Sequence, residues 1–249
     1  MLILRDINVT LGKSSKLERK ILNNLSVDIK AGEFVVVIGG NGAGKSTMFN
    51  VISGFLRPDS GQIIIDGQDA TNMPQIHRSA LVSKVMQDPR VGTMENMTIF
   101  ENMAFAFKRG QSRGLRPFFN NSNRQFFQKK LQMLNMGLEN LMDELVSNLS
   151  GGQRQAISLV MSILADSKIL LLDEITSALD PGSSEAIMQL TAKIIKEEKR
   201  TCIMITHNMD QAINYGDRLL LLKNGVFIAD YDADAKSRLN YATLASDFL

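Results

Sequence analysis

A glycine-rich stretch at residues 39–46 constrains this chain more than any other part of its sequence. It reads GGNGAGKS, with the spacing G-x-x-x-x-G-K-S, and it follows a continuous apolar run at residues 34–38. A helical pattern follows over residues 48–56, with its start near Lys45. A buried strand, a glycine-rich turn and a helix in this order form a phosphate-binding loop, because glycines let successive backbone N–H groups face one anion and the helix dipole adds positive charge. A glycine-rich turn that binds nothing is the alternative, and the Lys-Ser pair argues against it.

The side chains of this loop suit the phosphates of a nucleotide that is bound with Mg²⁺. Lys45 is expected to reach the β- and γ-phosphates, Ser46 to hold Mg²⁺ through its hydroxyl group, and Thr47 to add a phosphate contact. The other loop residues expected around the phosphates are Gly39, Asn41, Gly42, Ala43 and Gly44.

A second buried strand ends in two carboxylates. The apolar run at residues 169–172 is followed by Asp173 and Glu174. Carboxylates at the C-terminal edge of a strand face the crevice where open α/β sheets bind their ligands. Asp173 therefore suits the Mg²⁺ site, and Glu174 suits a general base that orients and deprotonates the water attacking the γ-phosphate. By itself, the same sequence could form a solvated turn at the end of a strand. The assignment of Asp173 and Glu174 to a site therefore depends on the presence of the phosphate loop.

Composition and patterning fit an α/β protein without disulfides. Residues 3–10 and 25–29 alternate apolar and polar side chains as half-buried strands do, whereas the polar residues 12–20 are expected to form a loop. Asn224-Gly225, between two apolar runs, predicts a hairpin. The single cysteine among 249 residues excludes a disulfide scaffold and a cysteine-based zinc site. The longest apolar runs are about five residues, whereas a membrane helix needs about 20.

Residues 149–153 read LSGGQ. Together with the phosphate loop and the Asp-Glu pair, this motif makes almost the whole chain resemble the nucleotide-binding subunits of ABC transporters, whose signature it matches. By itself, Ser-Gly-Gly at a helix start is a second anion site, with an ordinary helix cap as the alternative. The resemblance implies that two cassettes pack head to tail, so that the signature of one closes over the ATP held by the other. The signature residues expected at the nucleotide are Ser150, Gly151, Gly152 and Gln153.

The same resemblance assigns roles to further positions. Gln87, in MQDP, resembles the glutamine that contacts Mg²⁺ or water and senses the γ-phosphate, and residues 177–180 resemble the segment that crosses the dimer interface and brings Asp180 to the nucleotide. His207, in ITHN, resembles the switch histidine on the γ-phosphate, although a lone histidine after a strand is more often structural. The implied catalytic residues are Lys45, Gln87, Glu174 and His207, and the implied metal ligands are Ser46, Gln87 and Asp173.

Two positions depart from the family pattern. Leu11 stands where the family usually has an aromatic residue that stacks on adenine, so the stacking is expected to be weaker or to come from another residue. Gly40 stands where the family often has proline or serine, and a further glycine keeps the loop permissive.

The resemblance implies an α/β fold of the P-loop NTPase class, with a RecA-like core, an antiparallel β subdomain and an inserted α-helical subdomain. We expect one nucleotide-binding domain over residues 1–249. We expect its core and β subdomain to consist of about residues 1–87 and 166–249, and its helical subdomain to consist of about residues 88–165. No proline- or serine-rich linker divides the chain.

The middle of the chain is basic and rich in phenylalanine. Residues 102–138 hold seven basic and no acidic side chains. Residues 94–107 are expected either to line the groove that receives a membrane partner's helix or to form the subdomain's own core. Residues 108–119 suit a solvated loop, a face toward anionic lipid or a permease, or a nucleic-acid patch. The sequence assigns no role to the rest of the basic segment 108–130 or to the C-terminal tail 231–249.

The resulting prediction is an ATPase subunit that hydrolyses Mg-ATP and powers solute transport across the cytoplasmic membrane, by import and with amino acids as a candidate solute. The expected partners are a second cassette, a transmembrane permease and an extracytoplasmic solute-binding protein, with no nucleic acid. The expected location is the cytoplasmic face of the membrane. The alternatives are an exporter cassette, which shares every nucleotide motif, and a soluble ABC ATPase acting on ribosomes or DNA. A plain P-loop kinase or GTPase is disfavoured by the signature and by the lack of an NKxD motif.

Overall fold

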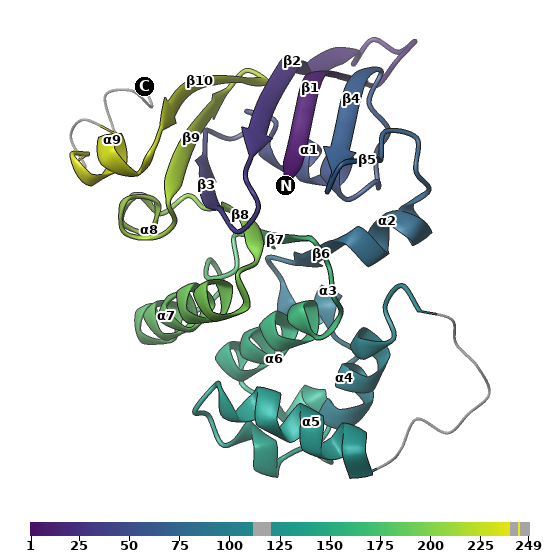
Figure 1. Ribbon diagram of the computed structural model, residues 1–249, viewed down its shortest axis with the longest axis vertical. Coiled ribbons are helices and arrows are strands. Elements are labelled where there is room, and N and C mark those ends of the chain that lie inside the picture. Colours follow the sequence, from purple (N-terminus) through teal and green to yellow (C-terminus); the bar gives the residue numbers. More distant parts are fainter. Residues whose placement is uncertain (112–120, 240–243, 245–249) are drawn as a thin grey trace.

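The apolar run at residues 34–38 forms a central strand of the larger sheet. The computed structural model describes residues 1–111, 121–239 and 244, and Figure 1 shows the arrangement of its elements. The larger sheet has the strand order β10-β9-β3-β8-β7-β6. Its strands are β3 (Phe34–Ile38), β6 (Val82–Val85), β7 (Ile169–Asp173), β8 (Thr201–Ile205), β9 (Arg218–Lys223) and β10 (Val226–Tyr231).

Neighbouring strands of this sheet are parallel, except β9 and β10. A parallel sheet is covered on both faces, which is why its strands are continuous apolar runs rather than alternating ones. On β3, Val35 and Val37 belong to one hydrophobic core, whereas Val36 and Ile38 belong to the other. The sheet therefore separates two cores, and every residue of β3 is buried.

The smaller sheet is antiparallel and covers the first of these cores. Its order is β2-β1-β4-β5. Its strands are β1 (Leu2–Leu11), β2 (Arg19–Ile29), β4 (Ser60–Ile65) and β5 (Gln68–Asp69). Helix α1 (Lys45–Ile52) packs between the sheets, because its Phe49 shares a core with Leu4 of β1 and Val37 of β3. The loop predicted over residues 12–20 is shorter than expected, since Arg19 already belongs to β2 and pairs with Leu11.

Helices cover the opposite face of the larger sheet. They are α3 (Pro89–Gly92), α4 (Ile99–Phe107), α5 (Asn121–Gln132), α6 (Gly151–Leu164), α7 (Pro181–Glu198), α8 (Met209–Asn214) and α9 (Ala233–Ser237), with short 3-10 helices at Leu138–Asn140 and Val146–Asn148. Helix α2 (Gln75–Leu81) lies on the side of α1 instead, since its Leu81 packs against the core that α1 shares with the smaller sheet. In Figure 1, α4, α5 and α6 gather at the end of the molecule remote from the smaller sheet. Among the helices within the described ranges, none has the length and apolar character needed to cross a membrane.

The arrangement has the layers of the predicted fold class. The central sheet carries the phosphate loop, an antiparallel sheet lies on one side, and a group of helices is inserted between β6 and β7. The subdomain boundaries near residues 87, 88, 165 and 166 stay a prediction. Nine residues of the basic segment, 112–120, and residues 240–243 and 245–249 of the tail lie outside the described residues.

Helix α1 ends earlier than the predicted 48–56 pattern. Its last residue is Ile52, and Gly54 takes φ +77°, which turns the chain out of the helix. The buried guanidinium of Arg78 donates hydrogen bonds to the carbonyl oxygens of Ile52 (3.1 Å) and Val51 (3.3 Å). These oxygens have no partner within the helix, and a cation at the negative end of the helix dipole stabilises them.

The predicted hairpin joins β9 to β10 and supports the phosphate loop. Asn224 and Gly225 have φ values of 51° and 78°, as a two-residue turn of type I′ requires. The backbone N–H of Gly225 donates to Ala43 (2.9 Å), and its carbonyl accepts from Asn23 (3.1 Å). A Cβ atom at Gly225 would lie 2.2 Å from the carbonyl oxygen of Ile21. Glycine is therefore required here both by its backbone conformation and by the close approach of β2.

We predict that Gly225→Ala destabilises the protein more than Gly67→Ala. Gly67 has a similar φ of 80° but nothing within 4 Å of its Cβ position, so it is a matched control. Both variants lose about 1–2 kcal/mol to the left-handed backbone, and Gly225→Ala loses about 1–3 kcal/mol more to the clash with β2. Urea titration of both variants measures the free energy of unfolding, and equal losses would contradict the packing argument.

Candidate functional site

The phosphate loop is held in shape by two glycines that contact neighbouring strands. A Cβ atom at Gly39 would lie 2.3 Å from the carbonyl oxygen of Leu222, and one at Gly44 would lie 2.8 Å from the Leu22 side chain. Gly44 also has φ +107°, which side chains rarely adopt. Gly40, in contrast, faces open space. The loop thus lies directly against β9 and β2, whereas a side chain at position 40, such as the serine that the family often has, would also fit.

Lys45 places its ammonium group inside this loop. Its side chain is only 7% exposed, and Nζ donates to the carbonyl oxygens of Gly39 (2.7 Å) and Gly40 (3.1 Å). Burial lowers the pKa of Lys45, and the nearby carboxylates of Glu174 and Asp173 act in the opposite direction. A phosphate in the loop would meet both this cation and the positive end of α1, whose first turn carries no acidic residue.

A cleft of about 240 Å³ opens above the loop. Most of the predicted site residues line it, including two that come from the ends of β7 and β8. The lining residues are Arg19, Ile21, Asn41, Gly42, Ala43, Gly44, Lys45, Ser46, Thr47, Glu174 and His207. The fold therefore brings the loop, Glu174 and His207 to one place, as the sequence predicted.

Glu174 and His207 contact each other in this cleft. The His207 Nε2 atom lies 2.6 Å from Oε1 of Glu174. Glu174 has φ 49°, an uncommon conformation for a residue other than glycine, and its backbone N–H donates to Ile205 (3.0 Å). Strained residues of this kind cluster at functional sites, where the surrounding structure enforces them. The side chain of Glu174 lines the same cleft as the phosphate loop.

Asp173 and Gln87 lie beside the cleft rather than on its lining. Asp173 forms an ion pair with Lys84 of β6 (2.8 Å). Gln87 donates to the hydroxyl of Ser177 (3.1 Å), which donates in turn to the backbone carbonyl of Glu174 (2.9 Å). These two hydrogen bonds connect Gln87, which follows β6, to Glu174, the general-base candidate at the end of β7.

The donor set fits Mg²⁺ held largely by phosphate oxygens. Among the residues that the structure describes, no three His, Cys, Asp or Glu side chains form a cluster that could hold a metal alone. Mg²⁺ binds through one or two carboxylates together with substrate phosphates and water. The predicted ligands Asp173, Ser46 and Gln87 carry oxygen donors of this kind, and of the three only Ser46 lines the cleft in this structure.

The signature residues do not reach the cleft of their own chain. Ser150 caps α6: its hydroxyl accepts from the Gln153 N–H (3.2 Å), and the Gln153 side chain accepts from the Ser150 N–H (3.0 Å). Gly152 faces the start of α7, since its Cβ position lies 3.3 Å from Ser183 Oγ. Asp180 caps α7 by accepting from the Ser183 N–H (3.0 Å), and these hydrogen bonds lower the pKa of Asp180. The signature and the 177–180 segment therefore form a second surface, separate from the phosphate loop.

Two lining residues were missed by the sequence reasoning. Arg19 and Ile21 of β2 border the cleft, whereas Leu11 does not line it although it is 41% exposed. The ladder between β1 and β2 pairs Leu11 with Arg19, so the two sit opposite each other on neighbouring strands. Arg19 lay in the polar stretch assigned to a loop, and nothing in its neighbours marks it as a nucleotide contact.

A family model described as ABC transporter matches residues 22–177. The chain belongs to the ABC transporter family. A tyrosine transport ATP-binding protein from Clostridioides difficile (strain R20291) is 42% identical, over 92% of this chain and 90% of that protein. The thiamine import ATP-binding protein ThiQ of Escherichia coli (strain K12) is 34% identical, over 80% of this chain and 81% of its own length.

Solved cassettes share the fold. A dimeric structure of the ATP-binding cassette MJ0796, in a post-hydrolysis state bound to ADP and Pi, matches with a TM-score of 0.80 and 27% identity, over 94% of this chain and 99% of that one. The protein is thus an ATP-binding, ATP-hydrolysing cassette with the P-loop NTPase fold, as its sequence predicted.

We predict that Arg19→Ala weakens ATP binding by the cassette roughly two- to tenfold. Arg19 lines the cleft opposite Leu11, the position where the family stacks adenine, and a guanidinium group over an adenine ring would contribute about 0.5–1 kcal/mol or more. Leu11→Ala, one strand away, is the control and should change the affinity less than twofold. Isothermal titration calorimetry with ATP measures both. An unchanged affinity in the Arg19 variant would show that adenine is held elsewhere.

Proposed function

We propose that this cassette powers the import of a solute across the cytoplasmic membrane, by ATP-driven closure of a dimer that is coupled to a permease. The observation that carries the proposal is the split of the nucleotide site into two surfaces. The cleft holds the phosphate loop, Glu174 and His207, while Ser150 and its neighbours lie outside it. A second cassette in head-to-tail orientation would place its signature over the first cassette's phosphates.

The proposed roles follow from position and chemistry. Lys45 and the loop N–H groups bind the β- and γ-phosphates, and His207 donates a hydrogen bond to the γ-phosphate. Glu174 accepts a proton from the attacking water, because its carboxylate faces the loop beside His207 (2.6 Å). Mg²⁺, held by Ser46, Asp173 and Gln87, would neutralise charge on the β- and γ-phosphates. Loss of the γ-phosphate removes its contacts to both chains and lets the dimer reopen.

Docking to a permease is proposed at a cleft of about 770 Å³ between α2, α3 and the turn after α4. From the sequence, residues 94–107 could either line a partner groove or form the core of the subdomain, and the structure holds side chains that suit each alternative. Met94 and Phe105 line this cleft, and Phe105 is exposed. Met103 is fully buried in the core, and Phe107 packs on Phe127 with ring centroids 5.8 Å apart.

The direction and solute are proposed from the relatives. The names of two relatives specify tyrosine transport and thiamine import, and the first of them covers the cassette almost from end to end. This supports import, with an amino acid as the solute, over export and over a soluble ATPase acting on ribosomes or DNA. An importer of this kind would also use an extracytoplasmic solute-binding protein and would sit on the cytoplasmic face of the membrane.

Affinity purification of the tagged cassette from detergent-solubilised source membranes tests this function. We expect mass spectrometry to find a multi-span permease and a solute-binding protein. A permease alone would favour export, and ribosomal or DNA-bound partners without a permease would overturn the transport proposal.

We predict that Glu174→Gln retains ATP binding but lowers ATP turnover by at least a hundredfold, because general-base catalysis contributes about 10²–10⁴-fold. The variant should accumulate as an ATP-bound dimer. Phosphate-release assays and sedimentation velocity measure the two effects. Turnover equal to that of the wild type would refute the assignment of Glu174 as the base.

We predict that Ser150→Arg leaves ATP affinity unchanged and prevents the ATP-dependent dimer, since a bulky cation would occupy the position meant for the partner's γ-phosphate. Ser122→Arg, on the exposed face of α5, is the control and should dimerise normally. Sedimentation velocity with ATP, in the Glu174→Gln background, distinguishes the two. An ATP-dependent dimer of the Ser150 variant would contradict the two-chain site.

A further inference from the structure

One carboxylate of the predicted metal site is paired with a lysine of the same chain. Asp173 lies at the end of β7, and its Oδ2 atom accepts from Nζ of Lys84 in β6 at 2.8 Å. The Lys84 and Asp173 side chains are only 18% and 14% exposed, so water screens their attraction weakly. A half-buried ion pair therefore occupies the carboxylate that is predicted to hold Mg²⁺.

The register of two strands brings Lys84 to Asp173. Parallel pairing of β6 and β7 sets Lys84 opposite Leu171, two residues before Asp173. Residues two apart on a strand share one face, and Leu171 faces the core around α1. Lys84 and Asp173 therefore lie on the face of the sheet that α1 covers. The offset along the strands is about 6.6 Å, which the long lysine side chain spans.

Helix α1 supports the ammonium group from the other side. Nζ of Lys84 lies 5.7 Å from the centre of the Phe49 ring, a distance at which an aromatic face attracts a cation. Phe49 is fully buried and follows the phosphate-loop residue Lys45 by one helical turn. The helix that begins at the phosphate-binding lysine therefore also contacts the lysine that pairs with Asp173.

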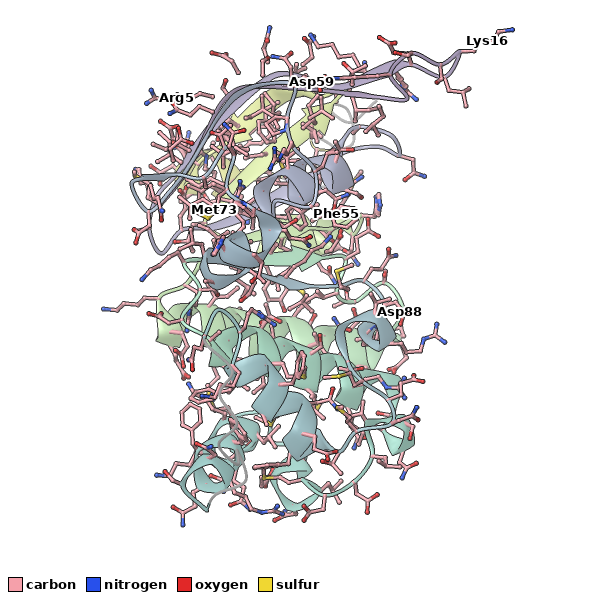
Figure 2. The ribbon with its side chains drawn as sticks, turned by 90° about the vertical axis from the view of Figure 1, so that its right-hand side faces the viewer. Arg5, Lys16, Phe55, Asp59, Met73 and Asp88 are labelled. Atoms are coloured by element: carbon pink, nitrogen blue, oxygen red, sulfur yellow. The ribbon has the colours of Figure 1, made fainter. Side chains whose placement is uncertain are left out.

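Asp173 does not line the nucleotide cleft, although its neighbour Glu174 does. Lys84 lines a different cleft of about 400 Å³, together with Phe55, which Figure 2 labels near mid-height of the molecule. Among the described residues that line this second cleft there is no aspartate or glutamate. Lys84 therefore has space to turn away from Asp173, but no second carboxylate there to hold it.

Asp173 lies within electrostatic reach of the phosphate loop. Burial lowers the pKa of Lys45, whereas Glu174 and Asp173 both act in the opposite direction. An unpaired Asp173 carboxylate would therefore also repel the phosphates of a nucleotide that arrives without metal. Mg²⁺ carries twice the charge of an ammonium group, so a carboxylate beside the metal gains free energy by exchanging one cation for the other.

We propose that Lys84 is a positioning residue for the metal site: it holds Asp173 beside the cleft until nucleotide binds with Mg²⁺, and Asp173 then exchanges the ammonium group for the metal, directly or through a metal-bound water. The inference rests on the proposed role of Asp173 as a metal ligand. Without Lys84, the carboxylate would repel a metal-free nucleotide and attract the metal more strongly. The metal would then contribute more to nucleotide binding than it does in the wild type.

Calorimetry with ADP measures this contribution, because the cassette does not hydrolyse ADP. The quantity compared is the ratio of the Kd of ADP in EDTA to its Kd in Mg²⁺. We expect Lys84→Met, which keeps an apolar side chain over Phe49, to raise this ratio roughly fivefold or more, within the range typical of coupled sites. Lys84→Arg should keep the wild-type ratio, since guanidinium also pairs with a carboxylate. Lys129→Met, which removes the same charge from an exposed position of α5, is the control and should also keep it.

A double-mutant cycle shows whether Lys84 acts through Asp173. Asp173→Asn alone should lower the ratio, because it removes a charged metal ligand. In the Asp173→Asn background, Lys84→Met should leave the ratio nearly unchanged. A rise of the same size in both backgrounds would mean that Lys84 acts through its charge alone, and would overturn the proposal. Circular dichroism checks folding, and Lys84→Gln replaces the methionine variant if that one does not fold.

The outcomes separate this inference from the proposed function. If Asp173→Asn leaves the ratio unchanged, Asp173 does not bind the metal, and both its proposed role and the exchange fail. If Asp173→Asn lowers the ratio while Lys84→Met leaves it unchanged or lowers it, the role of Asp173 stands and the exchange with Lys84 is refuted.

Discussion

The structure depends on how closely the phosphate loop approaches the strands that flank it. Gly39 lies against the carbonyl of Leu222, and the turn residue Gly225 donates a hydrogen bond to Ala43 (2.9 Å). The contact at Gly39 leaves no room for a side chain there, and together these contacts hold the backbone of the loop against β9. A preorganised concavity of this kind binds phosphate without the entropic cost of ordering a mobile loop. The same packing directs Lys45 inward and keeps the start of α1 open to an anion.

The rest of the site is assembled from strand ends. Parallel pairing of β3, β8 and β7 brings their C-terminal ends to one edge, where the loop, His207 and Glu174 meet. The Gln87 to Ser177 hydrogen bond links this edge to the segment that leads into the helices beside the proposed permease cleft. These contacts offer a short physical connection between the nucleotide site and the proposed permease cleft.

Much of this was predictable because the signals were local. The apolar run of β3, the phosphate loop and the Asn224-Gly225 turn each specify their conformation through a few neighbouring residues, and all three were predicted correctly. The position of Glu174 followed from a general rule about strand ends, whereas that of His207 followed from the resemblance to the family. Features that depend on distant packing were missed. Arg78 caps α1 from another helix, Arg19 enters the cleft because β2 begins early, and Arg109 is half-buried where Gly110 fits against Ala80. These contacts join segments that are far apart in the sequence, so no local sequence pattern predicts them.

The central claim is that one nucleotide is held between the phosphate loop of one chain and the signature of another. Mixed dimers test it most directly, with Asn41→Cys in one chain and Ser150→Cys in the other; the native Cys202 is fully buried and its thiol pKa is raised by that burial, so it should not compete. Disulfide crosslinking of the mixture is measured with and without ATP, in the Glu174→Gln background. The account predicts a crosslinked heterodimer that forms only with ATP. A crosslink that ignores nucleotide, or none in the presence of ATP, would contradict it.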